Sequence, residues 1–264
     1  MKSLKRIALS IFLYPLFILV AVLLLPVMLL TAIVCSRDPT RRYPGWLLRA
    51  YGRFIVACIP DWKFSVEGNV PEDIGRRGYV VIANHSSTGD IYLLSTLPWD
   101  MRWVAKAELL RLPLMGQLLW LSGDILLKRG NKQSVLRMFE ACRTTLKHGL
   151  PVMIFPEGTR SKDGLRPFKD GAFQIALETG APILPLALTG TRQSVSSNGV
   201  TLGQMNARIR ILDPIPTEGR GPEALAELRD EARRRIEEAI GQMNQADRPR
   251  IDASPLNQTN PSLN

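Results

Sequence analysis

Residues 79–90 read Tyr-Val-Val-Ile-Ala-Asn-His-Ser-Ser-Thr-Gly-Asp, an apolar run that leads into a polar segment. The run 79–83 has the length and β-branched content of a buried strand, and a helical pattern begins at Ile91. Loops just beyond the carboxyl ends of strands are where α/β proteins place ligands and chemistry. We therefore predict a strand, a functional loop and a helix in that order, with His85 and Asp90 in the loop.

Short β-rich runs alternate with helical patterns through the chain after Trp62. The predicted strands cover residues 63–66, 79–83, 102–105, 125–127, 152–155, 183–188 and 208–212. The predicted helices cover residues 131–147 with Asn131 as the cap, 170–178 before Gly180, and 222–243. This alternation predicts an α/β fold with a mixed, largely parallel sheet covered by helices.

The predicted helix 222–243 has one apolar face, made by Leu225, Leu228, Ala232, Ile236, Ala239, Ile240 and Met243. It also carries three consecutive arginines, Arg233 to Arg235, which could be taken for a ligand site. Three acids on the same helix, Glu231, Glu237 and Glu238, balance them. We therefore interpret the arginines as part of a solvated face.

The N-terminal segment from Ile7 to Ser36 contains no charged residue, and about 20 apolar residues suffice to span a bilayer. A cleavable signal would have an apolar core of only about 7–15 residues and a small-residue cleavage site, so we predict a retained membrane segment. Because Pro15 and Pro26 tend to kink helices and basic residues flank both ends, we favour a kinked hairpin or re-entrant helix over a simple span. Residues 43–60 predict a basic, aromatic-rich amphipathic helix that lies among lipid headgroups.

The positive charge is concentrated near the N-terminus. Residues 1–60 contain eight Lys or Arg and one acid, a net charge of +7 out of +10 for the whole chain. Because these cations border a membrane-length apolar run, they predict binding to anionic membrane lipid and argue against nucleic acid as a partner. We divide the chain into a membrane-anchoring helical segment, 1–60, an α/β domain, 61–246, and a disordered tail, 247–264.

The histidine and the aspartate of the first loop have the chemistry of a general base. A histidine with an ordinary pKa near ~6.5 is largely neutral at pH 7 and can take a proton from a hydroxyl group. Asp90 could bind one ring nitrogen of His85 as a donor and leave the other as the base. A buried histidine beside an aspartate cap would give the same spacing, so the pair alone does not decide between these roles.

Other kinds of site have little support in the sequence. The sequence has no G-x-S-x-G elbow and no evident covalent nucleophile, so the reacting hydroxyl is expected to belong to the substrate. Three scattered cysteines and two histidines argue against a metal site.

A second polar loop, Phe155-Pro156-Glu157-Gly158-Thr159-Arg160-Ser161, follows the predicted strand at 152–155. With residues 103–129 and 181–187, the two loops resemble the four blocks of the glycerolipid acyltransferase family, in order, over about residues 62–215. That family includes the 1-acyl-glycerol-3-phosphate acyltransferases, which make phosphatidic acid. The asparagine before His85, the Pro-Glu-Gly-Thr-Arg run and the prolines of the last block carry the resemblance.

The resemblance implies transfer of a fatty acyl group from a thioester to the hydroxyl of lysophosphatidic acid, with no bound cofactor. The thioester co-substrate would be acyl-coenzyme A or acyl carrier protein. His85 would deprotonate the hydroxyl and Asp90 would orient its ring, a form of help worth about 10²–10⁴ in rate. The implied acceptor site consists of Lys106, Arg129, Glu157, Gly158, Thr159 and Arg160, with guanidinium groups suited to the phosphate.

Two further details stay open at the level of sequence. The oxyanion of the tetrahedral intermediate needs N–H donors, for which the backbone near Gly158 and the helix start at Asp90 are both candidates. The apolar residues after Met101, from Leu109 to Trp120, could line an acyl tunnel or pack in the core.

The resemblance also implies a membrane location, and we expect the catalytic domain on the cytoplasmic face, where acyl thioesters occur. One alternative keeps the reaction and changes the acceptor, for example to a lyso-ornithine lipid. A second is a thioesterase or lipid hydrolase that uses His85 to activate water. A third is a catalytically silent lipid-binding protein, which the presence of His85, Asp90, Glu157 and Arg160 disfavours.

Overall fold

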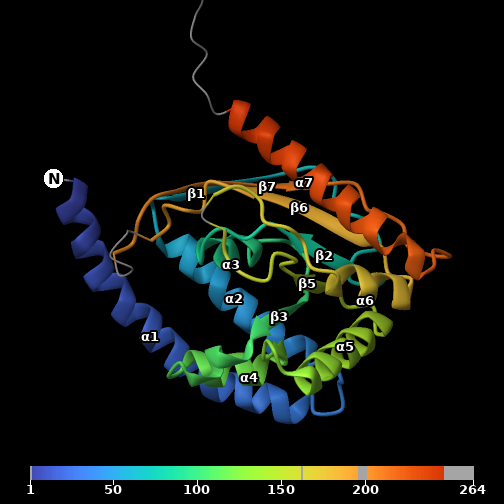
Figure 1. The fold of residues 1–264 in the computed structure, drawn as a ribbon. Coiled ribbons are helices and arrows are strands. Elements are labelled where there is room, and N and C mark those ends of the chain that lie inside the picture. Colours follow the sequence, from blue (N-terminus) through green and yellow to red (C-terminus); the bar gives the residue numbers. More distant parts are fainter. Residues whose placement is uncertain (1, 162, 196–200, 247–264) are drawn as a thin grey trace, which may run out of the picture.

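Seven strands form one sheet at the centre of the computed structural model, which describes residues 2–161, 163–195 and 201–246 (Figure 1). The strands are β1 (Trp62–Glu67), β2 (Val80–Ala83), β3 (Arg102–Lys106), β4 (Ile125–Leu127), β5 (Val152–Ile154), β6 (Ile183–Thr189) and β7 (Met205–Ile211). Their order across the sheet is β1-β7-β6-β2-β5-β3-β4. The predicted tail, 247–264, lies outside the described residues.

The sheet is mixed and mostly parallel, as predicted. Strands β6, β2, β5, β3 and β4 run in one direction, and the only antiparallel pairing between the named strands of the described residues joins β6 to β7. Each predicted strand is present, and β4 has the predicted bounds. Strand β7 begins at Met205, earlier than the predicted Arg208, because Met205 pairs with Trp62 of β1.

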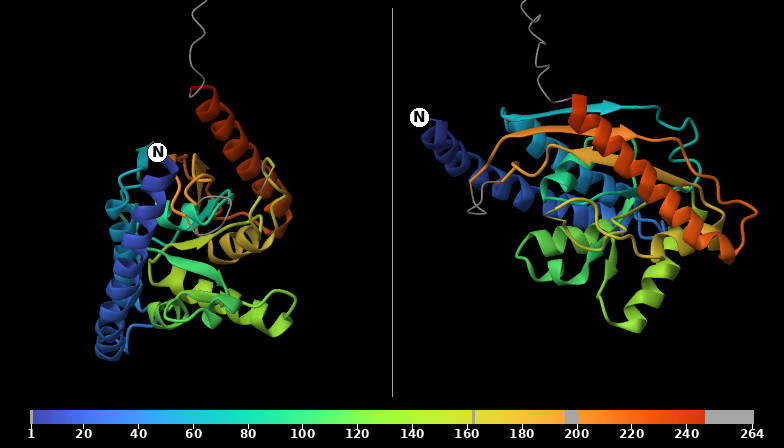
Figure 2. Two further views of the ribbon diagram at one scale, coloured as in Figure 1. Left: turned by 90° about the vertical axis from the view of Figure 1, so that its left-hand side faces the viewer. Right: turned by 45° about the horizontal axis from the view of Figure 1, so that its top comes forward.

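Helices cover both faces of the sheet (Figure 2). One face carries α1 (Lys2–Val34), α2 (Arg42–Cys58), α3 (Gly89–Leu94) and α4 (Met115–Ser122), which follows the short η1 (Ala107–Arg111). The other carries α5 (Lys132–Lys147), α6 (Gly171–Thr179) and α7 (Leu225–Ala246), which follows η2 (Pro222–Ala224). Side chains of β2 alternate between the two cores, Val81 and Ala83 in the first, Val80 and Ile82 in the second.

The N-terminal segment differs from the predicted kinked hairpin. Helix α1 is continuous through Pro15 and Pro26, and the chain reverses only after it. Asp38 makes this reversal, since its carboxylate accepts hydrogen bonds from the backbone N–H groups of Thr40 and Arg42, at 2.8 and 2.7 Å. The helical pair is therefore α1 with α2.

The apolar face of α2 packs on the protein, and the location of this helix among lipid headgroups stays a prediction. Tyr51, Ile55 and Val56 belong to the same core cluster as one face of the sheet. Arg49 is 5% exposed and forms an ion pair with Asp124, which lies just before β4. Residues 1–60 thus share a core with the predicted α/β domain.

The helices on the second face follow the predicted pattern closely. The side chain of Asn131 caps α5 by accepting the N–H of Ser134 at 2.8 Å. Helix α7 buries Leu228, Ala232, Ile236, Ala239 and Met243. Its arginine run forms ion pairs one turn away along the helix, with the partners Glu237, Glu238 and Glu231. The interpretation of these arginines as a solvated face is confirmed.

Candidate active site

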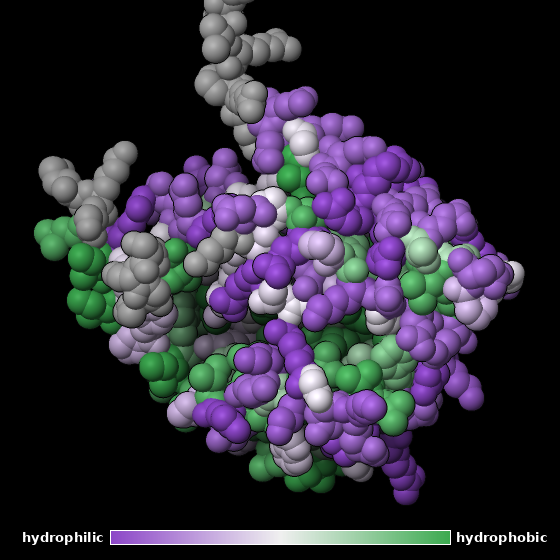
Figure 3. All heavy atoms as spheres, viewed as in Figure 1, coloured by the Kyte–Doolittle hydropathy of each residue, from purple (hydrophilic) through white to green (hydrophobic). Residues whose placement is uncertain are grey.

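The polar loops of the sequence meet at one edge of the sheet. Strands β6, β2, β5, β3 and β4 are parallel, so their carboxyl ends lie along the same edge. His85 follows β2 and the Glu157 loop follows β5, while Lys106 ends β3 and Arg129 comes just after β4. The molecular surface is hollowed on the face that Figure 3 shows, between α3 and α4.

His85 and Asp90 form the hydrogen-bonded pair that their spacing predicts. His85 Nδ1 lies 2.8 Å from Asp90 Oδ2, and the Asp90 carboxylate is fully buried. The same oxygen accepts the backbone N–H groups of Ser86 and Ser87, at 2.7 and 2.9 Å. An ionised carboxylate only accepts hydrogen bonds, so Nδ1 carries the proton and Nε2 is left as an acceptor.

The aromatic ring of Phe155 packs flat against the imidazole. The two ring centroids are 4.0 Å apart and the planes are inclined by 16°. Phe155 directly follows β5, the neighbour of β2 in the sheet. One face of His85 is therefore covered by a side chain from the second polar loop.

Glu157 binds backbone groups on both sides of the site. It is 2% exposed, and its Oε1 accepts the backbone N–H of His85 at 2.7 Å while its Oε2 accepts that of Arg166 at 2.9 Å. Burial raises the pKa of the Glu157 carboxyl, and the two N–H groups act in the opposite direction. The geometry suits a residue that holds the loop of His85 more than one that touches an acceptor.

The asparagine before His85 continues the sheet where β2 ends. The side-chain amide of Asn84 donates to the carbonyl of Leu188 at 2.9 Å, and its oxygen accepts the N–H of Leu188 at 2.7 Å. Both bonds reach across to β6, so the chain can leave β2 toward His85 without orphaning these backbone groups.

The remaining members of the predicted acceptor site lie on the surface of the same edge. Lys106, Arg129, Thr159 and Arg160 are exposed, and they lie at or just after the carboxyl ends of three neighbouring strands, β3, β4 and β5. Gly158 has a φ of 69°, a left-handed conformation that suits glycine, and Lys169 would contact a side chain placed there. The structure thus gives this edge several cations free to face solvent.

Both candidate oxyanion donors are already engaged by the chain. The N–H of Gly158 donates to the carbonyl of Phe155 at 3.0 Å, and that of Asp90 donates to the carbonyl of Ser87 at 3.3 Å. Neither N–H points freely toward a substrate, so we do not assign the oxyanion to them.

The apolar segment after Met101 divides between surface and core. Leu118 is fully buried, whereas Leu109, Leu112 and Trp120 are 41%, 49% and 58% exposed. These exposed side chains belong to η1, α4 and the turn between them, and α4 packs on α1.

Two contacts of the site have no signal in the sequence. The sequence predicts no role for Phe155, which packs on His85, or for Thr191, whose hydroxyl binds Asp90. Each contact joins residues that are far apart along the chain, so no local spacing could have indicated it.

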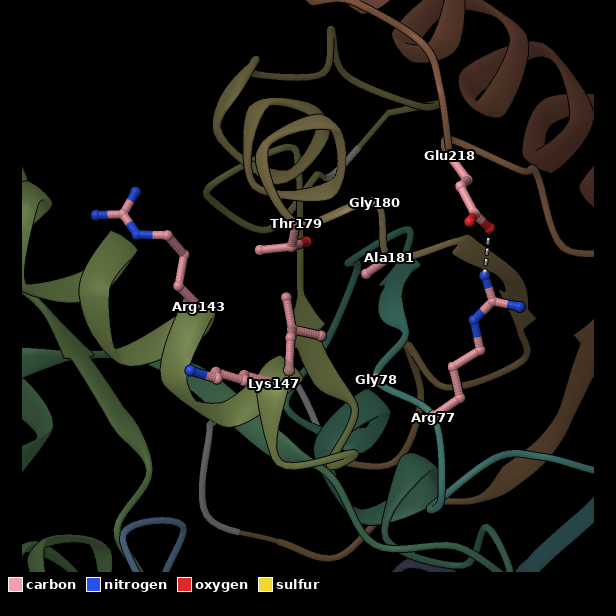
Figure 4. Close-up of a pocket in the computed structure, with 9 residues that line it drawn as sticks. Arg77, Gly78, Arg143, Lys147, Thr179, Gly180, Ala181 and Glu218 are labelled. Atoms are coloured by element: carbon pink, nitrogen blue, oxygen red, sulfur yellow. Dashed lines mark ion pairs between the residues drawn. The ribbon is translucent and has the colours of Figure 1, made fainter.

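A separate pocket of about 540 Å³ lies at the opposite edge of the sheet (Figure 4). Its lining includes Gly78 and Ala181, just before β2 and β6. Its arginines are paired, Arg77 with Glu218 at 3.5 Å and Arg143 with Glu178 at 2.7 Å. This pocket is remote from His85 and has no part in the candidate active site.

Comparison with known proteins assigns this arrangement to a family. The family model described as Acyltransferase matches residues 63–189. A chloroplast 1-acyl-sn-glycerol-3-phosphate acyltransferase of Arabidopsis thaliana is 34% identical over 209 residues, which are 77% of this chain and 56% of that protein. The 1-acyl-sn-glycerol-3-phosphate acyltransferase of Escherichia coli is 31% identical over 198 residues, 74% of this chain and 80% of that protein.

The fold agrees with a solved structure, that of the 1-acyl-sn-glycerophosphate acyltransferase PlsC from Thermotoga maritima. The TM-score is 0.75 at 24% identity, over 92% of this chain and 98% of that chain. The chain spans about half the length of the first plant relatives, 53% for Brassica napus and 56% for Arabidopsis thaliana. Because it also covers 80% of the Escherichia coli relative at more than 30% identity, this chain belongs to the acyltransferase family that includes the 1-acyl-sn-glycerol-3-phosphate acyltransferases.

Proposed function

We propose that this protein transfers a fatty acyl group from an acyl thioester to the sn-2 hydroxyl of lysophosphatidic acid, giving phosphatidic acid. The observation that carries the proposal is the bond from His85 Nδ1 to the buried Asp90 carboxylate, 2.8 Å long, which leaves Nε2 as a base. The family membership reported above supports the reaction class, and the Escherichia coli relative is named for this acceptor.

The proton transfers of this reaction need a base and a leaving group that accepts a proton. His85 Nε2 takes the proton of the acceptor hydroxyl as its oxygen attacks the thioester carbon. Collapse of the tetrahedral intermediate breaks the carbon–sulfur bond, and the imidazolium returns the proton to the departing thiolate. The products are the ester and a free thiol. Asp90 stabilises the imidazolium between these steps, as an orienting carboxylate does in other acyl transferases and hydrolases.

The phosphate of the acceptor fits the cations at the ends of β3, β4 and β5. We assign it to Arg160, Lys106 and Arg129, which are exposed and lie on the same edge as His85. Guanidinium groups bind phosphate oxygens through paired, charge-assisted hydrogen bonds. Gly158 and Thr159 complete this loop, and its glycine conformation allows the chain to turn toward the acceptor.

The acyl donor and the location follow from the lipid substrate. We propose acyl-coenzyme A or acyl carrier protein as the donor, with no bound cofactor. One helix of the described residues, over Leu4–Val34, is long and apolar enough to cross a membrane. Only 17% of the most apolar 18-residue stretch of this helix is buried in the protein. We therefore propose that this helix holds the enzyme at an anionic bilayer, with the catalytic edge on the cytoplasmic side.

The test compares purified wild-type protein with the His85→Ala variant in detergent micelles. Lysophosphatidic acid is supplied with either acyl-coenzyme A or acyl carrier protein, and phosphatidic acid and free thiol are both measured. We expect phosphatidic acid from wild type alone, with a loss of at least about 10²-fold in the variant. The thermal unfolding midpoint of the variant serves as the control for folding.

Other outcomes would replace the proposal. Turnover by His85→Ala close to that of wild type would rule out His85 as the base. Free thiol without phosphatidic acid would indicate a thioesterase. Transfer to a lyso-ornithine lipid in preference to lysophosphatidic acid would change the acceptor and leave the mechanism in place.

A further inference from the structure

We propose that Thr191, in the loop after β6, is a positioning residue for the catalytic pair. Its hydroxyl, Oγ1, binds Oδ1 of Asp90, the oxygen that does not face His85. Both residues are buried, with Thr191 at 1% and Asp90 at 0% exposed. The inference rests on the proposed function, because it concerns how His85 is held for that reaction.

The direction of each hydrogen bond in this group can be deduced. The Asp90 carboxylate only accepts, so the hydroxyl proton of Thr191 points at Oδ1. The Thr191 oxygen then accepts from Ser86 Oγ, which lies 3.2 Å away. Oδ2 accepts three N–H donors and Oδ1 accepts the Thr191 hydroxyl, so both oxygens of the carboxylate are held. The carboxylate is therefore fixed in rotation as well as in position.

Thr191 is itself held by the loop that carries His85. Ser87 Oγ donates to the backbone carbonyl of Thr191 at 2.9 Å, and the N–H of Ser194 reaches the same carbonyl at 3.0 Å. Gly89 packs so closely here that a Cβ would stand 2.4 Å from Ser194 Oγ. The two loops thus interlock, and they place the Thr191 hydroxyl against Asp90.

This geometry gives Thr191 a role in the reaction and not only in packing. If the Asp90 carboxylate could rotate, the hydrogen bond between Oδ2 and His85 Nδ1 would be broken in a fraction of the molecules. In those molecules, Nε2 would point away from the acceptor hydroxyl. Small losses of alignment lower the rate of the chemical step strongly. Binding of the lipid, which depends on other residues, should be unaffected.

The experiment compares three substitutions in the full-length protein. Thr191→Val keeps the shape and removes the hydroxyl, and Thr191→Ser restores it. Thr217→Val is the matched control, because Thr217 is also 1% exposed and its hydroxyl is also bonded, to the carbonyl of Ala181 at 2.9 Å, away from the site. We expect Thr191→Val to lower kcat about tenfold, with KM for lysophosphatidic acid unchanged. Thr191→Ser should recover most of the lost kcat. The kcat of Thr217→Val should stay within about twofold of that of wild type.

A double variant separates positioning from general damage. Once Asp90→Ala has removed the carboxylate, adding Thr191→Val should cost less than about twofold in kcat, because residues that act through one another are not additive. An undiminished tenfold loss in that background, or equal losses of kcat in Thr191→Val and Thr217→Val, would overturn the inference. So would a Thr191→Val enzyme with wild-type kcat.

A spectroscopic measurement decides the point even without turnover. The sequence has only two histidines, His85 and His148, so ring ¹⁵N labelling gives two sets of signals, and a His148→Gln variant assigns them. We expect the Nδ1–H proton of His85 to shift or broaden in Thr191→Val and to keep its position in Thr217→Val. If wild type transfers no acyl group, the proposed function fails, and an unchanged His85 signal in Thr191→Val would separately refute the positioning role.

Discussion

At the scale of single residues, two buried carboxylates hold His85 from two directions. Asp90 binds the ring at Nδ1, and Glu157 binds the backbone N–H of the same residue at 2.7 Å. Phe155 covers one face of the ring. The resemblance to the family had implied that Glu157 belongs to the acceptor site. We propose instead that Glu157 sets the position of His85 and that the exposed Arg160 meets the phosphate.

Substitution of Glu157 by glutamine tests this division of roles. The amide would turn an NH₂ group toward a backbone N–H, either that of His85 or that of Arg166, and leave one of these two donors without its acceptor beside the 2%-exposed Glu157 side chain. A buried unsatisfied group costs about 1–3 kcal/mol. We expect Glu157→Gln to lower the free energy of unfolding by that amount, and kcat by about tenfold, with little change in KM for lysophosphatidic acid.

Arg160→Gln is the companion variant, and it should have the opposite signature. Loss of a charge-assisted bond worth about 1.5–3 kcal/mol should raise KM for lysophosphatidic acid about tenfold or more, with stability unchanged. Steady-state kinetics and thermal unfolding of the two proteins provide the comparison. If Glu157→Gln raises KM as Arg160→Gln does, Glu157 touches the acceptor after all.

At the scale of elements, the turn between α1 and α2 sets where the second helix of this pair begins. Arg41 has a φ of 46°, and the Asp38 carboxylate satisfies backbone N–H groups at the start of α2. Arg102 of β3 reaches the same turn and donates to the carbonyls of Thr40 and Arg41. This turn therefore joins the helical pair to the sheet.

The turn predicts a pH-dependent contribution to stability. Burial raises the pKa of Asp38, but hydrogen bonds from Thr40 and Arg42 and the charge of Arg102 together bring it below its ordinary value of 3.8. A lowered carboxyl pKa stabilises the fold above the unfolded pKa, and this contribution is lost as the pH falls through the folded pKa. We expect Asp38→Asn to cost about 0.5–1.5 kcal/mol at pH 7, because the amide oxygen can replace only one of the two carboxylate oxygens that accept backbone N–H groups.

Unfolding by urea in detergent, at pH 7 and in steps down to about pH 3, measures that difference. The difference in the free energy of unfolding between wild type and Asp38→Asn should narrow as the pH falls below 3.8, because the wild-type carboxylate then becomes protonated. The exposed Asp213→Asn serves as the control and should match wild type throughout. A gap that is constant with pH would show that the carboxylate charge has no part in the turn.

At the scale of the whole molecule, α1 carries 13 of the 24 large apolar side chains that are exposed among the described residues. Leu19 and Leu23 are 54% and 61% exposed, and α1 packs through its other side on α2 and α4. Large exposed apolar surfaces on folded proteins mark membrane or partner sites. Together with the +7 charge of residues 1–60, this supports the proposed bilayer location.

Charges placed on this side should release the protein from lipid without unfolding it. Burying one leucine side chain is worth about 1.5–3 kcal/mol, so Leu19→Glu with Leu23→Glu should lower partitioning into anionic vesicles by well over tenfold. The matched control is Leu136→Glu, since Leu136 is 62% exposed on α5, on the other face of the sheet. Vesicle co-sedimentation, with thermal unfolding for each variant, gives the result. Equal vesicle binding by the double variant and by wild type would place the membrane contact elsewhere.

Much of the fold could be predicted because its signals are local. Short β-branched runs between turn residues located all seven strands, and the Asn131 cap and the apolar face of residues 222–243 located α5 and α7. The contact between His85 and Asp90 could be predicted because the two residues are only five positions apart and the loop between them is short. The face that α2 buries could not be predicted, because a basic amphipathic helix fits a bilayer surface and a protein core equally well.

The sequence by itself thus determined the strands, the helices of the second face, the hydrogen-bonded pair of His85 and Asp90, and the family, because these depend on residues close together in the chain. The tertiary structure alone decided which distant groups complete the site. Glu157 lies 72 residues from His85 and Thr191 lies 101 residues from Asp90, and they meet only because β5 and β6 flank β2 in the sheet. Strand order depends on the packing of both faces at once, and no local pattern of residues encodes it.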